Sequence, residues 1–317
     1  MASIRYSFVI PVFNEEQTLP ELAGRLKEMM SQLDGEAEVV FIDDGSRDRS
    51  YALMEEIRSA DSRFRVIRFS RNFGHQIAIT AGIDYAQGDA VTIMDADLQD
   101  SPEVVLKMIE KWKEGYEIVY GVRVERKGDT LFKKITAKGF YWLLQKLSDT
   151  QVPMEAGDFR LVDRKAVDAF KKLRENHRYV RGMFSWIGFR QTGVEFVRAE
   201  RFAGETKYPF IKMFRFAMDG IMSFSNAPLR LALNIGFFIS LLSFVLGIWL
   251  ILSKMMGYAS TVPGWVSLVV IIFFIGGVQL IVTGILGEYI ARIYTEIKQR
   301  PLYVVRDAQG FESTSQS

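Results

Sequence analysis

Residues 90–100 read AVTIMDADLQD, a short apolar run followed by three aspartates. Short apolar runs bounded by polar turn residues are typical of buried β-strands. Comparable runs lie at residues 6–10, 38–42, 65–69 and 117–120, and helical patterns such as residues 19–33 and 51–59 follow most of them. This alternation predicts an α/β fold with a parallel sheet that helices cover on both faces.

The loops that follow these strands form the expected ligand-binding edge of the sheet. In open parallel sheets, ligands bind at the carboxyl ends of the strands. The corresponding loops are residues 11–16, 43–48, 70–76 and 95–100. Polar side chains in these loops are therefore the first candidates for a functional site.

Asp95 and Asp97 directly follow the strand at 90–94. Two carboxylates with this spacing can point at one cation where the chain leaves the sheet. Magnesium and manganese prefer oxygen ligands and leave coordination positions open for phosphate oxygens. An Asp-x-Asp pair alone is a weak signal, and a helix-capping loop with solvated acids is the alternative. The strand end before it and the Ser101-Pro102-Glu103 helix start after it favour the metal site.

Residues 41–46 read FIDDGS and also end a predicted strand. Carboxylates here could accept hydrogen bonds from a nucleobase or ribose, or they could belong to an ordinary acidic turn closed by Gly45. No Gly-x-Gly-x-x-Gly follows the first strand, and no Gly-x-x-x-x-Gly-Lys-[Ser/Thr] loop occurs in the sequence. The first absence argues against a dinucleotide cofactor, and the second against a phosphate loop.

Two later segments carry charge. Residues 157–164 read GDFRLVDR, and taken alone this pattern is best explained by a surface ion pair. Residues 201–208 read RFAGETKY, where Arg201 and Lys207 lie in the sequence at the position expected for a lipid headgroup contact. A basic patch that only tethers the chain to a membrane is the alternative for this second segment.

Composition excludes several classes of function. The 317 residues suffice for one large domain with an appendage, or for two domains. The net charge of +2 does not indicate a polyanion partner such as nucleic acid. The absence of cysteine excludes disulfides, thiolate metal sites and cysteine nucleophiles. With only His75 and His177, a multi-histidine zinc site is not expected.

Residues 231–252 and 265–287 contain no charged residue. Each segment exceeds the roughly 20 apolar residues that span a bilayer, so we expect two transmembrane helices. A pair of buried core helices is the alternative, although long soluble helices normally show a polar face. Basic residues flank the two segments on their outer ends: Arg201, Lys207, Lys212, Arg215 and Arg230 before them, and Arg292, Lys298, Arg300 and Arg306 after them.

This charge distribution predicts the orientation in the membrane. By the positive-inside rule, both ends of the chain lie in the cytoplasm, and Trp265 fits an interfacial anchor on the far side. The apolar run at residues 7–12 is too short for a secretory signal. We therefore expect a multi-pass protein of the cell (inner) membrane with a cytoplasmic catalytic domain.

Residues 208–226 predict a helix that lies on the membrane. Polar residues recur there at helical spacing and form one narrow stripe, while aromatic and aliphatic residues fill the rest. A wide apolar face with cations at its edge suits an interfacial helix, and a helix packed on the domain core is the alternative. Residues 131–147 have a similar character, with lysines beside aromatic residues.

Taken together, these motifs resemble glycosyltransferase family 2, and within it the polyisoprenyl-phosphate glycosyltransferases. The matching segments are residues 10–15 (IPVFNE), 43–46 (DDGS), 71–74 (RNFG), 95–99 (DADLQ), the segment around Asp158, residues 201–208, and residues 287–301. They occur in the matching order over nearly the whole chain. The group includes dolichyl-phosphate mannose synthases, and the two C-terminal spans are most similar to the bacterial bactoprenol glucosyltransferases. Glu205-Thr206 stands where a serine is common, which is a mild departure.

The resemblance implies a GT-A (Rossmann-like) fold, a UDP-sugar donor, an undecaprenyl-phosphate acceptor, and magnesium or manganese as cofactor. The implied nucleotide-sugar contacts are Pro11, Phe13, Glu15, Asp44, Asp95 and Ala96. The implied metal ligands are Asp95, Asp97 and Gln99. Arg123, Lys134, Arg201 and Lys207 would offer positive charge to the phosphates, and Asp97 and Asp158 would be catalytic. Whether Asp158 acts as a base or positions other groups stays open.

The expected function is therefore inverting, metal-dependent transfer of a hexose from a UDP-sugar to polyisoprenyl phosphate, for glycosylation of the cell envelope. Glucose is expected from the family branch, and mannose, galactose and modified arabinose remain open. A processive polysaccharide synthase would also need a Gln-x-x-Arg-Trp-type motif and more spans. A non-enzymatic membrane scaffold would not need Asp95, Asp97 and Asp158 together at the ligand edge.

The expected domains are a catalytic domain at residues 1–207, an interfacial helix at 208–228, a two-helix transmembrane anchor at 229–288, and a cytoplasmic C-terminal helix and tail at 289–317. We also expect homo-oligomers that form through the transmembrane and C-terminal segments.

Overall fold

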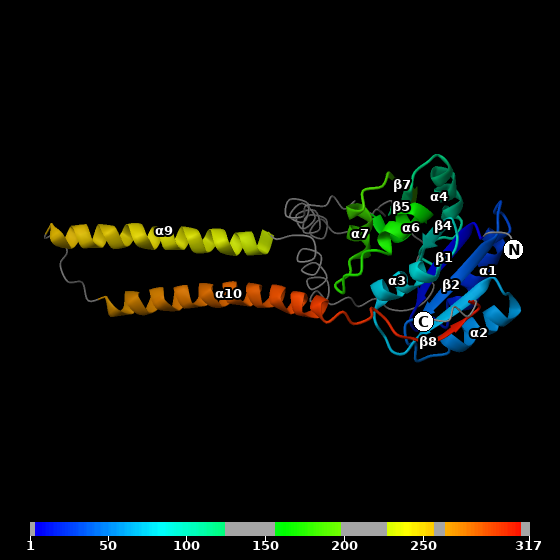
Figure 1. The fold of residues 1–317 in the computed structure, drawn as a ribbon, viewed down its shortest axis with the longest axis horizontal. Helices are drawn as coiled ribbons and strands as arrows, with labels where there is room; N and C mark the ends of the chain where they lie inside the picture. The colour runs from blue at the N-terminus through cyan, green and yellow to red at the C-terminus, as the bar shows by residue number, and fades with distance from the viewer. Residues whose placement is uncertain (1–3, 124–155, 198–226, 257–263, 312–317) are drawn as a thin grey trace. The chain divides into compact units, whose positions relative to one another are not determined.

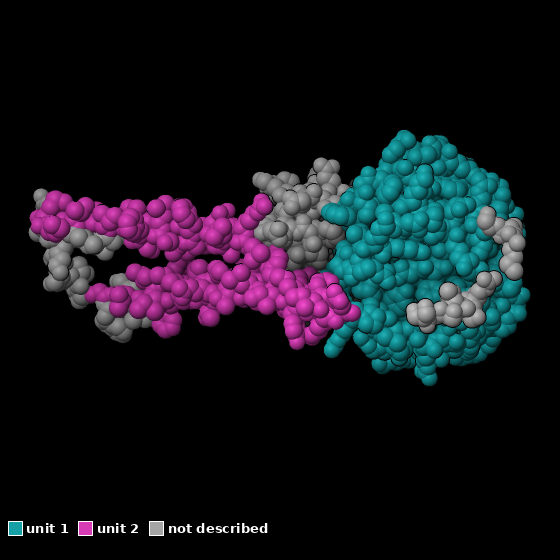
Figure 2. Space-filling model, in the orientation of Figure 1, with its two compact units in different colours: residues 1–146, 150–220, 300–317 teal, residues 147–149, 221–299 magenta. Residues whose placement is uncertain are grey.

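The computed structural model describes residues 4–123, 156–197, 227–256 and 264–311. The chain divides into two compact units, which Figure 2 distinguishes by colour. The first unit holds the sheet together with residues 300–317, and the second holds residues 221–299 with a short piece at 147–149. The predicted helices at 131–147 and 208–226 lie outside the described residues.

The first unit is built on one eight-stranded sheet with the order β7-β5-β6-β4-β1-β2-β3-β8. Its strands are β1 (Tyr6–Val12), β2 (Ala37–Asp43), β3 (Phe64–Phe69), β4 (Ala90–Ile93), β5 (Ile118–Arg123), β6 (Ala156–Asp163), β7 (Gln191–Phe196) and β8 (Val305–Gln309). The neighbours β4, β1, β2 and β3 are all parallel. The four loops predicted to carry ligands therefore follow four adjacent parallel strands, of which Figure 1 labels β4, β1 and β2.

Helices cover both faces of this sheet, as predicted. They are α1 (Leu19–Met30), α2 (Ser50–Ala60), α3 (His75–Tyr85), α4 (Val104–Lys113), α6 (Arg164–Phe170) and α7 (Val180–Trp186). Phe8 and Ile10 of β1 belong to the core cluster that includes apolar residues of α1, α2 and α4. Val9, which points to the other face because strand side chains alternate, packs against Gly82 of α3. Burial on both faces explains the uninterrupted apolar runs in the sequence.

The sheet is mixed, which the sequence patterns did not predict. β6 runs antiparallel between β4 and β5, β7 pairs in parallel with β5, and β8 runs antiparallel to β3. The sequence of β6 was not recognised as a strand because charged residues interrupt its apolar residues, although Phe159 and Leu161 are buried. The region expected as a C-terminal helix and tail also supplies the edge strand β8.

The second unit contains α9 (Ala227–Met255) and α10 (Trp265–Ile297). Both are long and apolar enough to cross a membrane, and they contact each other. Only 6% of the residues in the apolar window of α9, and none in that of α10, are buried, so the alternative of buried core helices is wrong. α10 extends past residue 288 to Ile297, within the range where a C-terminal helix was expected, and the domain boundaries stay predictions. Oligomerisation through these helices stays a prediction.

Candidate active site

The loops after β1 and β2 are tied together at the carboxyl edge of the sheet. The amide of Asn14 donates to Ser46 Oγ (3.1 Å), and the Asn14 side chain accepts from the amide of Arg47 (2.8 Å). Asn14 adopts a φ of 58°, a left-handed conformation that is uncommon outside glycine. Phe13 beside it is 45% exposed, whereas Pro11 is buried within β1. Among the predicted nucleotide contacts of this loop, Phe13 therefore has the most exposed ring.

Asp44 fastens the loop after β2 to the loop after β3. Its buried carboxylate accepts hydrogen bonds from the amides of Phe73 (2.6 Å) and Gly74 (3.0 Å). Burial raises the pKa of Asp44, and the two amide donors oppose that shift. The side chain therefore shapes the loop, and its predicted contact with a nucleotide stays a prediction.

His75 begins α3, immediately after this loop, and lies between two carboxylates of the site. Its Nε2 atom is 3.4 Å from Oδ1 of Asp95 and 3.6 Å from Oδ2 of Asp158. Partial burial lowers the pKa of His75, but the contact with Asp158 and the negative charge of Asp95 outweigh that effect, so the net pKa is raised. His75 thus links β4's loop with β6.

Asp158 lies on β6 and is almost completely buried, at 7% exposure, so the prediction of a surface ion pair is wrong. Arg181 of α7 donates to both carboxylate oxygens, from Nε to Oδ1 (2.8 Å) and from Nη2 to Oδ2 (3.2 Å). Gln76 donates its Nε2 to Oδ2 (3.2 Å), while its Oε1 accepts from the amide of Val180 (2.9 Å). Burial raises the pKa of Asp158, but His75 and Arg181 outweigh it and hold that pKa well below its usual range.

Arg160, the second charge of the same segment, is also buried and serves the strand itself. It donates to the carbonyl oxygens of Gly157 (2.8 Å) and Asp158 (3.3 Å). Its guanidinium also lies over the ring of Phe184, 4.9 Å from the centroid. Burial lowers the pKa of Arg160 to about 10, which leaves it protonated at neutral pH. Arg160 therefore stabilises the backbone next to Asp158.

The loop after β4 carries Asp95 and Asp97 to the same edge. Oδ1 of Asp97 accepts from the amide of Gln99 (3.1 Å). Leu98 between them is buried and has a φ of 59°, a costly conformation for a leucine. Strain of this kind persists where the surrounding structure imposes it, often at functional sites. This left-handed residue directly follows Asp97.

The donor set fits a magnesium or manganese ion whose remaining ligands come from a substrate. No group of three His, Cys, Asp or Glu side chains able to hold a metal occurs in the part of the chain that the structure describes. Magnesium commonly binds through one or two carboxylates together with substrate phosphates, without a complete protein cage. Asp95 and Asp97 would supply those carboxylates, and the role of Gln99 as a third ligand stays a prediction.

Several predicted residues lie where their side chains are not described. Lys134, Arg201 and Lys207 are outside the described residues, and Arg123 is described only by its backbone at the end of β5. The phosphate contacts predicted for these four basic residues stay predictions.

Two further predicted nucleotide-sugar contacts are described. Glu15 contacts Thr18 (3.0 Å) through its carboxylate, and Ala96 is buried in the loop after β4.

Three residues that contact Asp158 were not predicted as site residues: His75, Gln76 and Arg181. The loop at 70–76 was predicted as part of the ligand edge, and His75 is one of only two histidines, so these two facts together pointed to it. Arg181 has no comparable local signal, because only the packing of α7 against β6 brings it to Asp158.

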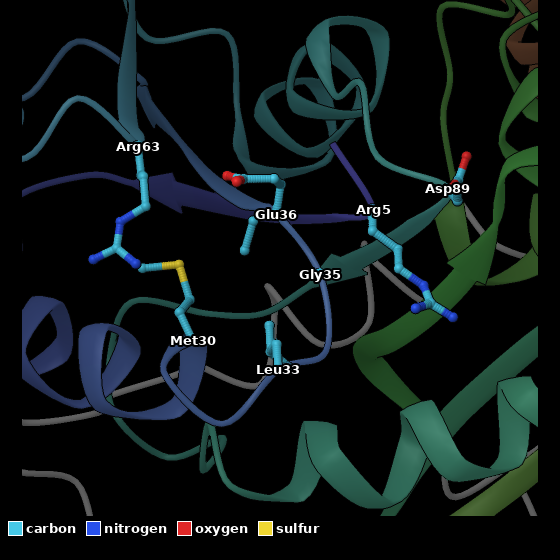
Figure 3. A pocket seen from close by; sticks show the side chains of 8 residues that line it. Arg5, Met30, Leu33, Gly35, Glu36, Arg63 and Asp89 are labelled. Carbon is cyan, nitrogen blue, oxygen red and sulfur yellow. The ribbon is translucent and has the colours of Figure 1, made fainter. Parts of the chain in front are cut away.

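A surface pocket lies away from these residues. Figure 3 shows its lining, which includes Arg5, Glu36, Arg63 and Asp89. These residues precede β1, β2, β3 and β4, so the pocket lies at the amino edge of the sheet, opposite the loops described above. Arg5 and Arg63 are already paired with Asp34 and Asp61 (3.1 and 2.7 Å). Both arginine side chains of this pocket are therefore already in ion pairs. The pocket contains none of the predicted site residues.

Comparisons with known proteins agree in the class of enzyme. The model of the family described as Glycosyl transferase family 2 matches residues 7–170. An uncharacterized glycosyltransferase of Bacillus subtilis is 53% identical over 310 residues, which are 98% of this chain and 96% of that protein. A bactoprenol glucosyl transferase of Shigella phage SfII is 42% identical over 96% of this chain and 98% of its own length.

A solved structure is similar to part of the chain at low identity. The glucosyl-3-phosphoglycerate synthase of Mycobacterium tuberculosis, in a complex described as containing Mn2+, UDP-glucose and phosphoglyceric acid, is 18% identical. Its TM-score is 0.47, over 69% of this chain and 79% of that one.

Proposed function

Because the chain belongs to glycosyltransferase family 2, we propose that it transfers glucose from UDP-glucose to the phosphate of a polyisoprenyl lipid, with inversion at the anomeric carbon. The enzyme class follows from family membership. The donor, the acceptor, the stereochemistry, the metal and the site residues are the parts that we propose.

The observation that carries the proposal is the length of the similarity to proteins named for this reaction. The bactoprenol glucosyl transferase of Shigella phage SfII matches 96% of this chain, whereas the family model matches only residues 7–170. The longer match therefore includes the region of α9 and α10, the two helices that are apolar enough to span a membrane. Such helices suit an enzyme whose acceptor is a membrane lipid.

The charges at the carboxyl edge of the sheet support phosphate chemistry. Both reactants are anionic, so the site must offset their mutual repulsion before a bond can form. Arg181 and His75 bring positive charge to this edge, and both are held in place by Asp158. Arg201 and Lys207 remain our candidates for the acceptor phosphate.

The acceptor itself needs little activation. The second pKa of a phosphate monoester is about 6, so the group is mostly dianionic at neutral pH. One of its oxygens attacks the anomeric carbon while the bond to UDP breaks, and UDP leaves with the electron pair. The product is a phosphodiester, and no proton has to be removed from the nucleophile. A general base is therefore not required.

This requirement fits the environment of Asp158. A carboxylate with a strongly lowered pKa is a weak base. We infer that Asp158 orients Arg181, His75 and Gln76 toward the reactants and does not accept a proton. Magnesium or manganese at Asp95 and Asp97, when bound, supplies stabilisation of the negative charge on the departing UDP.

We further propose that α9 and α10 cross the cell membrane with the catalytic unit on the cytoplasmic side. The basic residues that flank the two helices in the sequence support this orientation.

Transfer assays with the full-length protein in detergent test the proposal. The protein is incubated with undecaprenyl phosphate and radiolabelled UDP-glucose, UDP-galactose or GDP-mannose, with Mg2+, Mn2+ or excess chelator. We expect label from UDP-glucose in the lipid extract only when both the metal and the lipid are present. Label from GDP-mannose alone would overturn the assignment of UDP-glucose as the donor. A labelled water-soluble polymer would indicate a processive synthase. Full transfer in excess chelator would exclude the metal role.

A further inference from the structure

Residues 300–311, here called the C-terminal strap, return the chain from α10 to the catalytic unit. β8 pairs antiparallel with β3, with Ile67 opposite Ala308. Just before β8, the carbonyl oxygen of Val304 accepts from the amide of Ser70 (3.0 Å), at the start of the loop that leads to His75. The strap therefore lies next to a loop of the candidate active site, although more than 200 residues separate the two in sequence.

Tyr303 of the strap is linked to this loop through Phe69. Its ring stacks on Phe69 at the end of β3, with centroids 5.3 Å apart and an interplanar angle of 20°. Phe69 in turn packs edge-on against Phe73, at 5.5 Å. Aromatic pairs in such geometry contribute about 0.5–1.5 kcal/mol beyond area burial. The guanidinium of Arg71 also lies over the ring of Phe73, 3.9 Å from the ring centroid.

The same tyrosine also contacts the far end of α3. Its hydroxyl donates to Oδ2 of Asp84 (2.9 Å), in the last turn of the helix. Burial raises the pKa of Tyr303, and the charge of Asp84 raises it further, so the hydroxyl keeps its proton and remains a donor. Tyr303 thus contacts Phe69, at the end of the strand before this loop, and Asp84, in the last turn of α3.

The importance of α3 comes from its first two residues. His75 contacts Asp95 and Asp158, and Gln76 donates to Asp158. The backbone just before them is held from one side by the carboxylate of Asp44, through the amides of Phe73 and Gly74. A second support comes from Phe69, which packs against the ring of Phe73 and on which Tyr303 stacks. Removing this second support frees the loop to move without breaking any contact of the site directly.

We propose that Tyr303 is a positioning residue for the transfer reaction, acting through Phe69 and Phe73 on the loop that presents His75 and Gln76. The reaction named here rests on the proposed function, whereas the contacts of Tyr303 do not depend on it. It makes the residues after the second apolar helix part of the working catalytic unit. A shift of about 1 Å in a positioning group can cost up to about a hundredfold in rate.

Phe311 provides a matched control in the same strap. Its ring packs against Tyr85 at 5.0 Å, and the Arg65 guanidinium lies 5.3 Å from its centroid. Neither partner lies in the loop at 70–74. Phe311→Ala therefore removes a similar amount of aromatic packing from the strap without loosening Phe73.

The experiment compares Tyr303→Ala, Tyr303→Phe, Tyr303→Leu and Phe311→Ala in the full-length protein. For each, kcat and KM are measured with the nucleotide sugar that the wild type uses, at a temperature well below the lowest Tm of the set. We expect Tyr303→Ala to lower kcat/KM about tenfold or more, Tyr303→Phe to keep it within about twofold, and Phe311→Ala to lower Tm but not kcat/KM. Tyr303→Leu covers the case in which the alanine variant does not fold.

Hydrogen exchange supplies a readout that does not depend on the reaction. The amides of Phe73 and Gly74, which are bonded to Asp44, should exchange faster in Tyr303→Ala and at the wild-type rate in Phe311→Ala. Unchanged exchange at these amides, or a parallel loss of kcat/KM in Tyr303→Ala and Phe311→Ala, would overturn the proposal. If the wild type transfers no sugar from any donor, the proposed function fails, and exchange alone still decides whether Tyr303 holds the loop.

Discussion

Arg181 donates to both carboxylate oxygens of Asp158, at 2.8 and 3.2 Å. Its helix, α7, follows β6 in the sequence, whereas His75 and Gln76 precede β6. The carboxylate is therefore surrounded by donors that favour its ionised form. A group in this environment serves poorly as a proton acceptor and well as an anchor for cations. The predictions below follow from this relationship and from the loops around it.

Asp158→Asn should lower turnover by about a hundredfold or more while the protein remains folded. The amide keeps the volume of the carboxylate but removes the charge that holds Arg181 and His75. Asp163→Asn is the control, because Asp163 lies on the same strand and accepts from Trp112 (2.7 Å) and from the amide of Lys165 (2.9 Å). It should lower Tm and leave kcat unchanged. Wild-type turnover in purified Asp158→Asn would refute the assigned role.

The pH dependence of stability should separate Asp158 from an ordinary carboxylate. Its folded pKa lies well below its usual value of about 4, so its pairing stabilises the protein above that value and is lost only as pH falls toward the folded pKa. The difference in free energy of unfolding between wild type and Asp158→Asn should therefore be largest near neutral pH and shrink in acid. Denaturant unfolding at pH 7 and pH 3 measures it. If this difference in free energy of unfolding were the same at both pH values, the pairing of Asp158 with Arg181 and His75 would not be what stabilises the fold.

His75→Gln should lower kcat more than it raises the KM of the donor, because it removes the bridge between Asp95 and Asp158 and keeps a polar side chain. The raised pKa means that the imidazolium is present below this pKa and is lost as pH rises through it. The wild-type rate should therefore fall on the alkaline side, and this decline should be absent in His75→Gln. His177→Gln, which alters the only other histidine, is the control and should keep the wild-type profile.

Asp97→Ala should lower turnover by about a hundredfold and weaken the dependence of donor binding on Mn2+. Calorimetric titration of UDP with and without Mn2+ measures the second effect independently of turnover. Asp89→Ala is the control, because Asp89 lies at the amino edge of the sheet, in the pocket of Figure 3. Equal metal dependence in Asp97→Ala and wild type would contradict the metal site.

Gly45→Ala should destabilise the protein and weaken donor binding together. Gly45 has a φ of 74°, and an added Cβ would lie 2.7 Å from the amide nitrogen of Asn72. Backbone strain of this kind costs about 1–3 kcal/mol, and here it would displace the loop that leads to His75. In Gly24→Ala, by contrast, the added Cβ meets nothing within 4 Å on α1. That control should raise Tm and leave donor binding unchanged, because alanine favours helix over glycine.

Much of the sheet could be predicted because its signals are local. The runs at residues 6–10, 38–42 and 65–69 are apolar on both faces, and each is followed by a polar loop. The structure confirms these strands and brings their loops to one edge, next to Asp95 and Asp97. The two charge-free segments likewise predicted α9 and α10, since an apolar helix of this length has no polar face.

β6, the partners of Asp158 and β8 were decided by packing over long sequence separations. The segment at 157–164 looked like a surface ion pair, because charges in a short pattern give no sign of which strands will flank them. Its insertion between β4 and β5 buries Asp158, and only that burial requires the cations His75 and Arg181.

The amino-acid sequence by itself determined the strands β1 to β5 with the loops that follow the first four, the acidic pair after β4 and the two apolar helices, because each depends on neighbouring residues. Tertiary structure alone decided that the buried carboxylate of Asp158 is paired with Arg181 and His75, and that the C-terminal strap lies next to the loop before α3. Both depend on contacts between residues far apart in the chain, such as Tyr303 with Phe69, and no local pattern encodes such contacts.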